Sequence, residues 1–136
     1  DGFCQGDKKI RSEDVKKAKE LHPDALVLAH PECTSDTLAL ADFIGSTSQI
    51  IDYATASDSK KFLICTEMGV FYELMQKNPD KKFFSVGHRQ FCPNMKKVSL
   101  DKVLEKLEDL KDEVILPEEM CEQAKKPLDE MLRLAQ

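Results

Sequence analysis

The sequence predicts an α/β fold in which a parallel sheet carries helices on both faces, an α/β/α sandwich. Two observations predict it. Short apolar runs, too short for an ordinary helix, alternate along the chain with longer segments in which apolar residues recur at helical spacing. The runs are apolar at nearly every position, as in strands that are buried on both faces of a parallel sheet. Helices that alternate with such strands cover the two faces of one sheet.

Three segments are expected to be strands, at residues 25–29, 61–65 and 82–86. Before, between and after them, residues that favour helix N-termini indicate where helices begin. The expected helices begin near Ser12, Ser35, Ser46, Thr66, Ser99 and Pro117. A further short strand is expected at residues 113–116, and Pro127 is expected to bend or interrupt the last helix.

The composition limits the classes of protein to which the chain can belong. Its 136 residues are enough for one domain, 41% of them are hydrophobic and the net charge is −5. A nucleic-acid-binding surface is normally basic, so we expect no nucleic-acid partner. No apolar stretch reaches the roughly 18 residues of a membrane span and no signal peptide opens the chain, so we expect no membrane partner and a cytoplasmic location. The chain begins with Asp1 rather than Met, and we expect it to continue upstream.

The chain has five cysteines, an odd number, and no CxxC pair. A disulfide framework is therefore not expected, and reduced thiols fit a cytoplasmic protein. Cys65 lies in an apolar run and is expected in the core, whereas Cys4 and Cys92 lie in expected loops, where ligand cysteines usually occur. Cys33 is ambiguous because it lies next to a candidate site in sequence, and Cys121 on the last helix is expected in the core or at the surface.

The first apolar run ends abruptly in His30, Pro31, Glu32 and Cys33. Ligands of open α/β sheets bind outside the carboxyl ends of the strands. Pro31 fixes its own φ and favours an extended His30, which would hold His30 and Glu32 in a defined relation. We interpret this segment as a catalytic or ligand-binding site. The alternative is an ordinary surface turn with polar ends.

A second candidate site is Gly45-Ser46-Thr47, at the expected start of a helix. Backbone N–H groups and two hydroxyls at this position would suit a carboxylate or a phosphate. Ser and Thr are also common helix caps, and these residues alone favour an ordinary cap. The sequence contains neither GxGxxG nor a Walker lysine motif, so nucleotide binding has no support.

Seven short motifs are spread over nearly the whole chain. They are GFC at 2–4, HPDA at 22–25, HPEC at 30–33, ADFIGSTSQ at 41–49, TEMG at 66–69, CPNMKK at 92–97 and VILP at 114–117. In their order and approximate spacing, these motifs make the chain similar to the C-terminal part of the quinolinate synthase family (NadA), the A protein of de novo NAD biosynthesis.

The resemblance implies a fold of three similar α/β domains around a pseudo-threefold axis, each giving one cysteine to a shared 4Fe–4S cluster. Cys4 would be the ligand from the second domain and Cys92 the ligand from the third. Residues 1–11 would then end the second domain, residues 12–116 would form the third, and residues 117–136 would form a C-terminal helix. The first domain and its cysteine would lie upstream.

The resemblance also implies a reaction, the condensation of iminoaspartate with dihydroxyacetone phosphate to quinolinate. The iron without a protein ligand would act as a Lewis acid in the dehydration. The family is functionally linked to L-aspartate oxidase. We expect the 136 residues alone to be inactive. From a different class of function, the alternative is a non-catalytic α/β module that binds a small dicarboxylate.

By the same resemblance, His30 and Glu32 would be catalytic. The substrate-binding residues would be His30, Pro31, Glu32, Ser46 and Thr47. One residue departs from the family pattern: Asp7 stands where the family has a histidine, three positions after the cysteine. Glu67 and Lys96 lie in family motifs, and the sequence assigns them no physical role.

Overall fold

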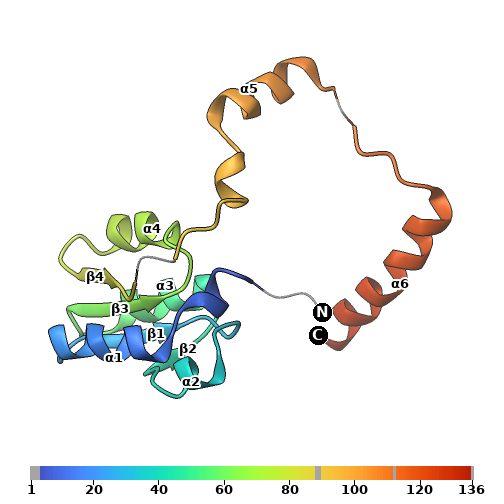
Figure 1. Cartoon of the computed structure of the whole chain (residues 1–136). Coiled ribbons are helices and arrows are strands. Elements are labelled where there is room, and N and C mark those ends of the chain that lie inside the picture. The colour runs from blue at the N-terminus through green and yellow to red at the C-terminus, as the bar shows by residue number, and fades with distance from the viewer. Residues whose placement is uncertain (1–3, 88–89, 112, 136) are drawn as a thin grey trace. The chain divides into compact units, whose positions relative to one another are not determined.

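The computed structural model describes residues 4–87, 90–111 and 113–135. The chain divides into two compact units, Asp1–Lys97 and Val98–Gln136. The first unit is built on a four-stranded, all-parallel sheet with the strand order β2-β1-β3-β4 (Figure 1). The predicted α/β fold with a parallel sheet is therefore confirmed.

The strands lie where the apolar runs predict them, with one addition. Their bounds are Leu26–Ala29 for β1, Phe43–Ile44 for β2, Lys61–Cys65 for β3 and Lys82–Ser85 for β4. The central pair runs in register from Leu26 opposite Phe62 to Ala29 opposite Cys65. Strand β2 was not predicted, because a strand of two residues has no periodicity to detect.

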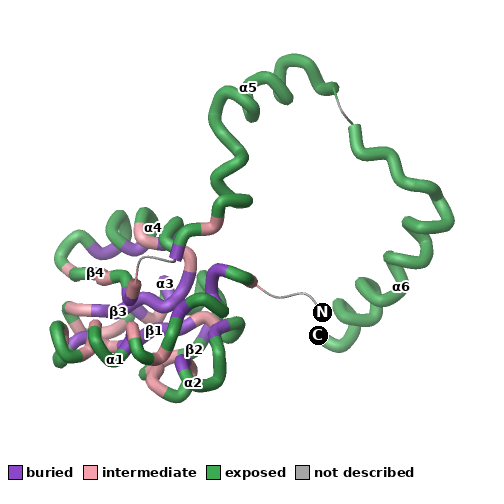
Figure 2. The backbone as a smooth tube through the Cα atoms, in the orientation of Figure 1, coloured by how far each residue is buried: buried purple, intermediate pink, exposed green. Residues whose placement is uncertain are grey.

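Side chains of the two central strands point alternately to opposite faces of the sheet, and each face has its own core. On one face, Val27, Ala29 and Leu63 pack in a cluster with residues of the first two helices. On the other face, Leu28 and Phe62 pack in a cluster with residues of the third and fourth helices. Figure 2 shows the buried residues concentrated in this unit. The sheet is therefore covered on both faces, as expected of a parallel sheet.

The helices of the first unit are α1 (Ser12–Leu21), α2 (Ser35–Leu38), α3 (Thr47–Ala56) and α4 (Val70–Lys77), with two short 3₁₀ helices, η1 (Asp7–Lys9) and η2 (Met95–Lys97). Only some of the predicted caps are confirmed. Ser46 caps α3 through a capping box: its N–H donates to Gln49 Oε1 at 2.8 Å, and its hydroxyl accepts from the Gln49 N–H at 3.4 Å. Ser12 is instead the first residue of α1, and α4 begins after Gly69 rather than at Thr66.

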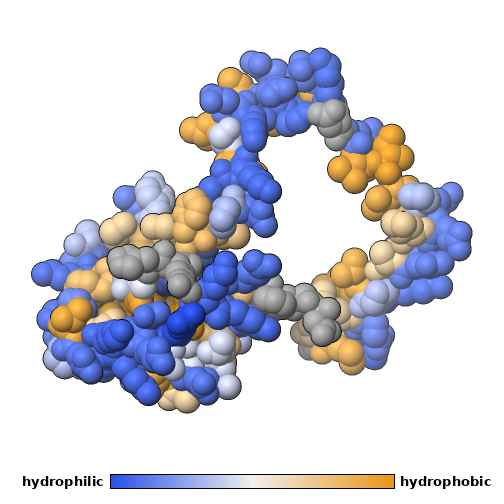
Figure 3. Space-filling model, in the orientation of Figure 1, coloured by the Kyte–Doolittle hydropathy of each residue, from blue (hydrophilic) through white to orange (hydrophobic). Residues whose placement is uncertain are grey.

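The second unit contains two amphipathic helices, α5 (Leu100–Asp109) and α6 (Glu118–Leu134). Their large apolar residues are exposed, as the hydropathy colouring in Figure 3 shows for both helices. Pro127 lies inside α6 without interrupting it, and residues 113–116 do not form the predicted strand. Among the described residues, no helix is long and apolar enough to cross a membrane.

The two-sided burial of the central strands predicts a large effect of shortening one buried leucine. Leu63 on β3 is 0% exposed, so Leu63→Ala should lower the free energy of unfolding by about 2–5 kcal/mol, measured by urea denaturation. The matched control is Leu21→Ala at the end of α1, where the leucine is 77% exposed and the expected change is under about 0.5 kcal/mol. Equal effects of the two substitutions would contradict the described core.

Candidate functional site

The order of the strands locates the candidate site at the carboxyl ends of β1 and β3. The chain passes from β1 to β2 on one side and then returns to β3 on the other. Ligands of open α/β sheets bind at such a reversal of strand order. His30 follows β1 directly and Thr66 follows β3, and the His30 N–H donates to the Cys65 carbonyl at 3.1 Å. The predicted HPEC segment therefore begins at the reversal point.

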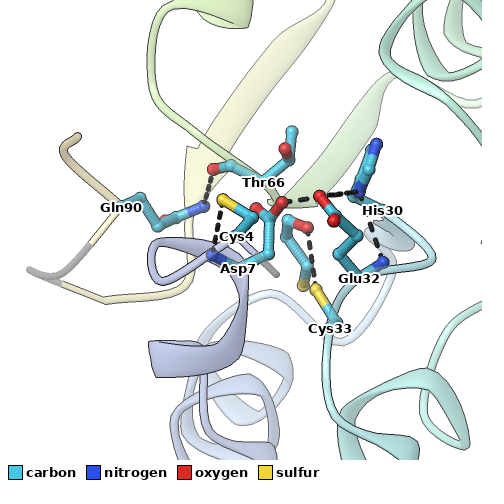
Figure 4. Close-up of polar contacts among 8 residues, drawn as sticks. Cys4, Asp7, His30, Glu32, Cys33, Thr66 and Gln90 are labelled. Atoms are coloured by element: carbon cyan, nitrogen blue, oxygen red, sulfur yellow. Dashed lines mark hydrogen bonds and ion pairs between the residues drawn. The ribbon is translucent and has the colours of Figure 1, made fainter. Parts of the chain in front are cut away.

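His30 has two carboxylates beside one ring nitrogen (Figure 4). Its Nδ1 lies 3.4 Å from Asp7 Oδ2 and 3.8 Å from Glu32 Oε2. The backbone N–H of Glu32 also points at Nδ1, at 3.3 Å. An unprotonated Nδ1 accepts this N–H bond, and a protonated Nδ1 pairs with the carboxylates. The surroundings thus provide a partner for Nδ1 with or without a proton, which suits a group that exchanges protons.

Asp7 reaches the site from η1, just after Cys4. Its side chain is buried, with the residue 3% exposed, and its Oδ1 has no hydrogen-bond partner among the described residues. A buried carboxylate oxygen without a partner is unfavourable by about 1–3 kcal/mol or more, so such an oxygen is typical of a site that serves a ligand. At this position, where the resemblance leads us to expect a histidine, the chain has a carboxylate that lies beside His30.

Three potential metal-binding atoms converge at this position. The Sγ of Cys4 and one carboxylate oxygen each from Asp7 and Glu32 lie within 4.8 Å of one another. Thiolate and carboxylate are both ligands of transition metals. The backbone N–H of Asp7 donates to Cys4 Sγ at 3.5 Å, and such a bond stabilises negative charge on the sulfur. Among the described residues, Cys92 is not a member of this group.

The five cysteines fall into distinct environments. Cys33 and Cys65 are buried in the core, and the Cys33 thiol donates to the Cys65 carbonyl at 3.3 Å. Burial raises the pKa of Cys33 to about 12 and raises the pKa of Cys65 further. Burial also raises the pKa of Cys4, which, like Cys92, is only half-buried. Cys121 is exposed on α6. The core position predicted for Cys65 is confirmed, Cys33 is also buried, and Cys121 lies at the surface rather than in the core.

The second candidate site lies at the same edge of the sheet. The Gly45 N–H donates to the Ala29 carbonyl at 3.1 Å, so the turn into α3 begins beside the end of β1. A Cβ on Gly45 would lie 2.7 Å from the Phe43 ring, so only glycine fits this turn without a shift. Ser46 and Thr47 are both exposed, and the Ser46 hydroxyl is engaged in the cap. Thr47 occupies the first helical position, where backbone N–H groups lack partners within the helix.

Gln90 is a structural residue that the sequence did not reveal. It is 4% exposed, its Oε1 accepts from the Val86 N–H at 2.9 Å, and its Nε2 donates to the Thr66 carbonyl at 2.7 Å and to the Ile64 carbonyl. It thus ties the start of the Cys92 segment to the end of β3. No sequence pattern distinguishes a glutamine in this role from a solvated one.

The structure brings Cys4, His30 and Glu32 together and adds Asp7 to them. Pro31 is exposed between His30 and Glu32. Predictions that involve residues 1–3 and 88–89 lie outside the described residues.

Comparisons with known proteins agree with the motifs. The family model described as quinolinate synthetase A protein matches residues 1–133. The chain is 52% identical to a quinolinate synthase of Caldicellulosiruptor bescii, over 98% of the chain and 44% of that relative. It is 50% identical to a quinolinate synthase of Caldicellulosiruptor saccharolyticus, over 99% of the chain and 45% of the relative. It is 43% identical to quinolinate synthase 2 of Methanosarcina acetivorans, over 98% of the chain and 43% of the relative. The chain therefore spans less than half the length of these curated relatives.

The environments of the cysteines predict a clear order of alkylation. With iodoacetamide at pH 8, Cys121 should be modified within minutes, while Cys33 and Cys65 should remain unmodified until a denaturant is added. The raised pKa means that the thiolate of Cys33 becomes dominant only above about pH 12. Raising the pH to 9 should therefore not make Cys33 reactive toward iodoacetamide. Peptide mass mapping measures the pattern. Rapid modification of native Cys33 at pH 8 would contradict its burial.

Proposed function

Because the chain belongs to the quinolinate synthetase A protein family, we propose that it is part of an enzyme that condenses iminoaspartate with dihydroxyacetone phosphate to quinolinate, in NAD biosynthesis. The products would be quinolinate, one phosphate and two waters. The observation that carries the proposal is the convergence of Cys4, Asp7, His30 and Glu32 at the end of β1. The remaining parts of the site would come from the rest of a longer protein.

We propose that Cys4 and Cys92 are two ligands of a 4Fe–4S cluster, with a third cysteine from outside this chain. The environments of the thiols support this choice, since both are half-buried in irregular segments of the first unit. Cys33 and Cys65 are poor ligands because both thiols are buried in the core of the first unit. A bound cluster with one iron free of protein ligands supplies a Lewis acid for the loss of hydroxide from the substrate.

We propose that His30 and Glu32 move protons during the reaction. Glu32 is the more accessible, with a side chain 47% exposed against 20% for His30. Glu32 can thus reach a substrate while its backbone N–H orients the His30 ring. Asp7 would act through His30 by holding its Nδ1. Pro31 keeps the two groups in a fixed relation and lines the same strip.

Thr47 and Ser46 would bind a substrate carboxylate at the N-terminus of α3. A helix N-terminus favours negative charge, and this one begins beside the end of β1. Since the Ser46 hydroxyl already caps α3, Thr47 is the stronger candidate for a side-chain contact.

The chemistry of the proposed reaction indicates the location of the enzyme and the source of one substrate. Reduced thiols fit a cytoplasmic location. Iminoaspartate is unstable in water, so an enzyme that oxidises L-aspartate, L-aspartate oxidase, would supply it. The 136 residues alone are expected to be inactive, since they lack one cluster ligand.

The proposed roles predict different effects for two substitutions in the complete protein, purified without oxygen. Cys92→Ser should lose both iron and quinolinate formation, because a cluster ligand is removed. Glu32→Gln should keep its iron and lose activity by about 10²–10⁴-fold, as expected for a proton-transfer group. Iron content and quinolinate formation measure both. Full iron content and activity in Cys92→Ser would contradict the ligand assignment.

Asp7→Asn should separate orientation of His30 from binding of the cluster. Asparagine has nearly the same shape but no charge, so His30 loses a charged partner at 3.4 Å and kcat should fall by about tenfold to a hundredfold. KM and iron content should stay close to those of the wild type. The control is Asp36→Asn at the exposed start of α2, which should change none of the three. Loss of iron in Asp7→Asn with unchanged kcat per iron would argue against the positioning role.

A further inference from the structure

The carboxylate of Glu67 gathers three donors from the segment that carries Cys92 and from the turn before α4. Its Oε2 accepts from the Gly69 N–H at 2.6 Å. Its Oε1 accepts from the Cys92 N–H at 3.3 Å and lies 3.2 Å from Lys96 Nζ. Glu67 therefore contacts the backbone of Cys92 directly, although 25 residues separate them in the chain.

The charge of Glu67 is suited to this arrangement. Its side chain is only 11% exposed, and burial alone would raise its pKa. The N–H groups of Gly69 and Cys92, together with Lys96, outweigh that effect, so the pKa of Glu67 is lowered. One carboxylate thus receives donors from both segments, with the Gly69 N–H at 2.6 Å and the Cys92 N–H at 3.3 Å.

Hydrogen bonds of Gln90 also hold the segment that carries Cys92. The Met68 N–H donates to the Gln90 carbonyl at 2.8 Å, and the buried Gln90 side chain binds the Thr66 carbonyl. Gln90 thus anchors the segment two residues before Cys92, and Glu67 anchors it at Cys92 itself and at Lys96. Both Gln90 and Cys92 are therefore hydrogen-bonded to residues that directly follow β3.

We infer that Glu67 is a positioning residue for Cys92: by binding the Cys92 N–H and Lys96, it holds the thiol in place to bind metal. The inference rests on the proposed role of Cys92 as a cluster ligand and adds a residue to it. The sequence assigned no role to Glu67 or Lys96. Glu67 itself is not expected to touch substrate.

Gly69 offers a way to disturb this arrangement without changing the charge of Glu67. Its φ of −59° and ψ of −26° are ordinary helical values, so alanine fits the backbone. The added Cβ would lie 2.7 Å from Glu67 Oε2, the end of a flexible side chain. The carboxylate must then move, while the fold is left with little strain.

The experiment uses the complete protein, purified without oxygen, in wild-type form and as Glu67→Gln and Gly69→Ala. The matched control is Glu73→Gln, which removes an exposed carboxylate paired with Lys77 at 2.9 Å on the neighbouring helix. The readouts are iron per polypeptide, the electron paramagnetic resonance spectrum of the reduced cluster, the rate of iron loss to a chelator, and the thermal unfolding midpoint. The last readout separates cluster effects from loss of the fold.

We expect Glu67→Gln and Gly69→Ala to lose iron about tenfold faster than the wild type, with an altered resonance spectrum, as expected for a lost hydrogen bond to a charged group. Glu73→Gln should behave as the wild type. If Glu67→Gln also lowers the thermal unfolding midpoint, its iron loss cannot be separated from loss of the fold, and the rate of iron loss from Gly69→Ala then tests the inference.

Two outcomes separate the inference from the proposed function. A wild-type protein that holds no iron would overturn the proposed function, and the inference with it. A wild-type protein that holds iron, with Gly69→Ala and Glu67→Gln losing it at the wild-type rate, would overturn the inference alone and leave the proposed function standing.

Discussion

The pairing of β1 with β3 is the constraint on which the rest of the first unit depends. Both strands are buried on both faces, and their register brings Ala29 opposite Cys65, so they end at the same level. A slip of one residue would turn every side chain to the wrong face, which fixes this register strongly. His30 and Thr66 therefore emerge side by side, and the candidate site is built outward from that point.

The site is also where the chain departs from the rules that stabilise it elsewhere. Asp7 is a buried carboxylate with one oxygen lacking a partner among the described residues, and it lies beside the Glu32 carboxylate and the Cys4 sulfur. Bringing acidic and sulfur groups together in a partly buried place opposes folding, since each disfavours the charge of the others. Such conflicts between local stability and arrangement are typical of functional sites, because a bound cation or a transferred proton relieves them.

The sequence predicted those features that follow from local pattern. Apolar runs identify β1, β3 and β4, because a strand buried on both faces must be apolar throughout. Of the predicted caps Ser12 and Ser46, only one has a signature in the sequence: Ser46 is followed three residues later by Gln49, which completes a capping box, whereas Ser12 has no such partner and is the first residue of α1. Residues 114–116 are apolar, yet residues 113–116 do not form a strand, since a strand also needs a partner. The Asp7–His30 contact is tertiary, and no local pattern contains it.

The two half-buried cysteines, Cys4 and Cys92, are held by different contacts, but both sets of contacts lead to the ends of the central strands. Cys4 is fixed locally by the Asp7 N–H, and Asp7 in turn contacts His30 at the end of β1. Cys92 is fixed over a long sequence distance by Glu67, which follows β3. Strands β1 and β3 are directly paired. Both cysteine segments therefore contact residues that follow these two strands, rather than only other loops. A metal site that draws ligands from several parts of a longer protein requires this, since ligands held on a rigid element keep their geometry while the other parts assemble around them.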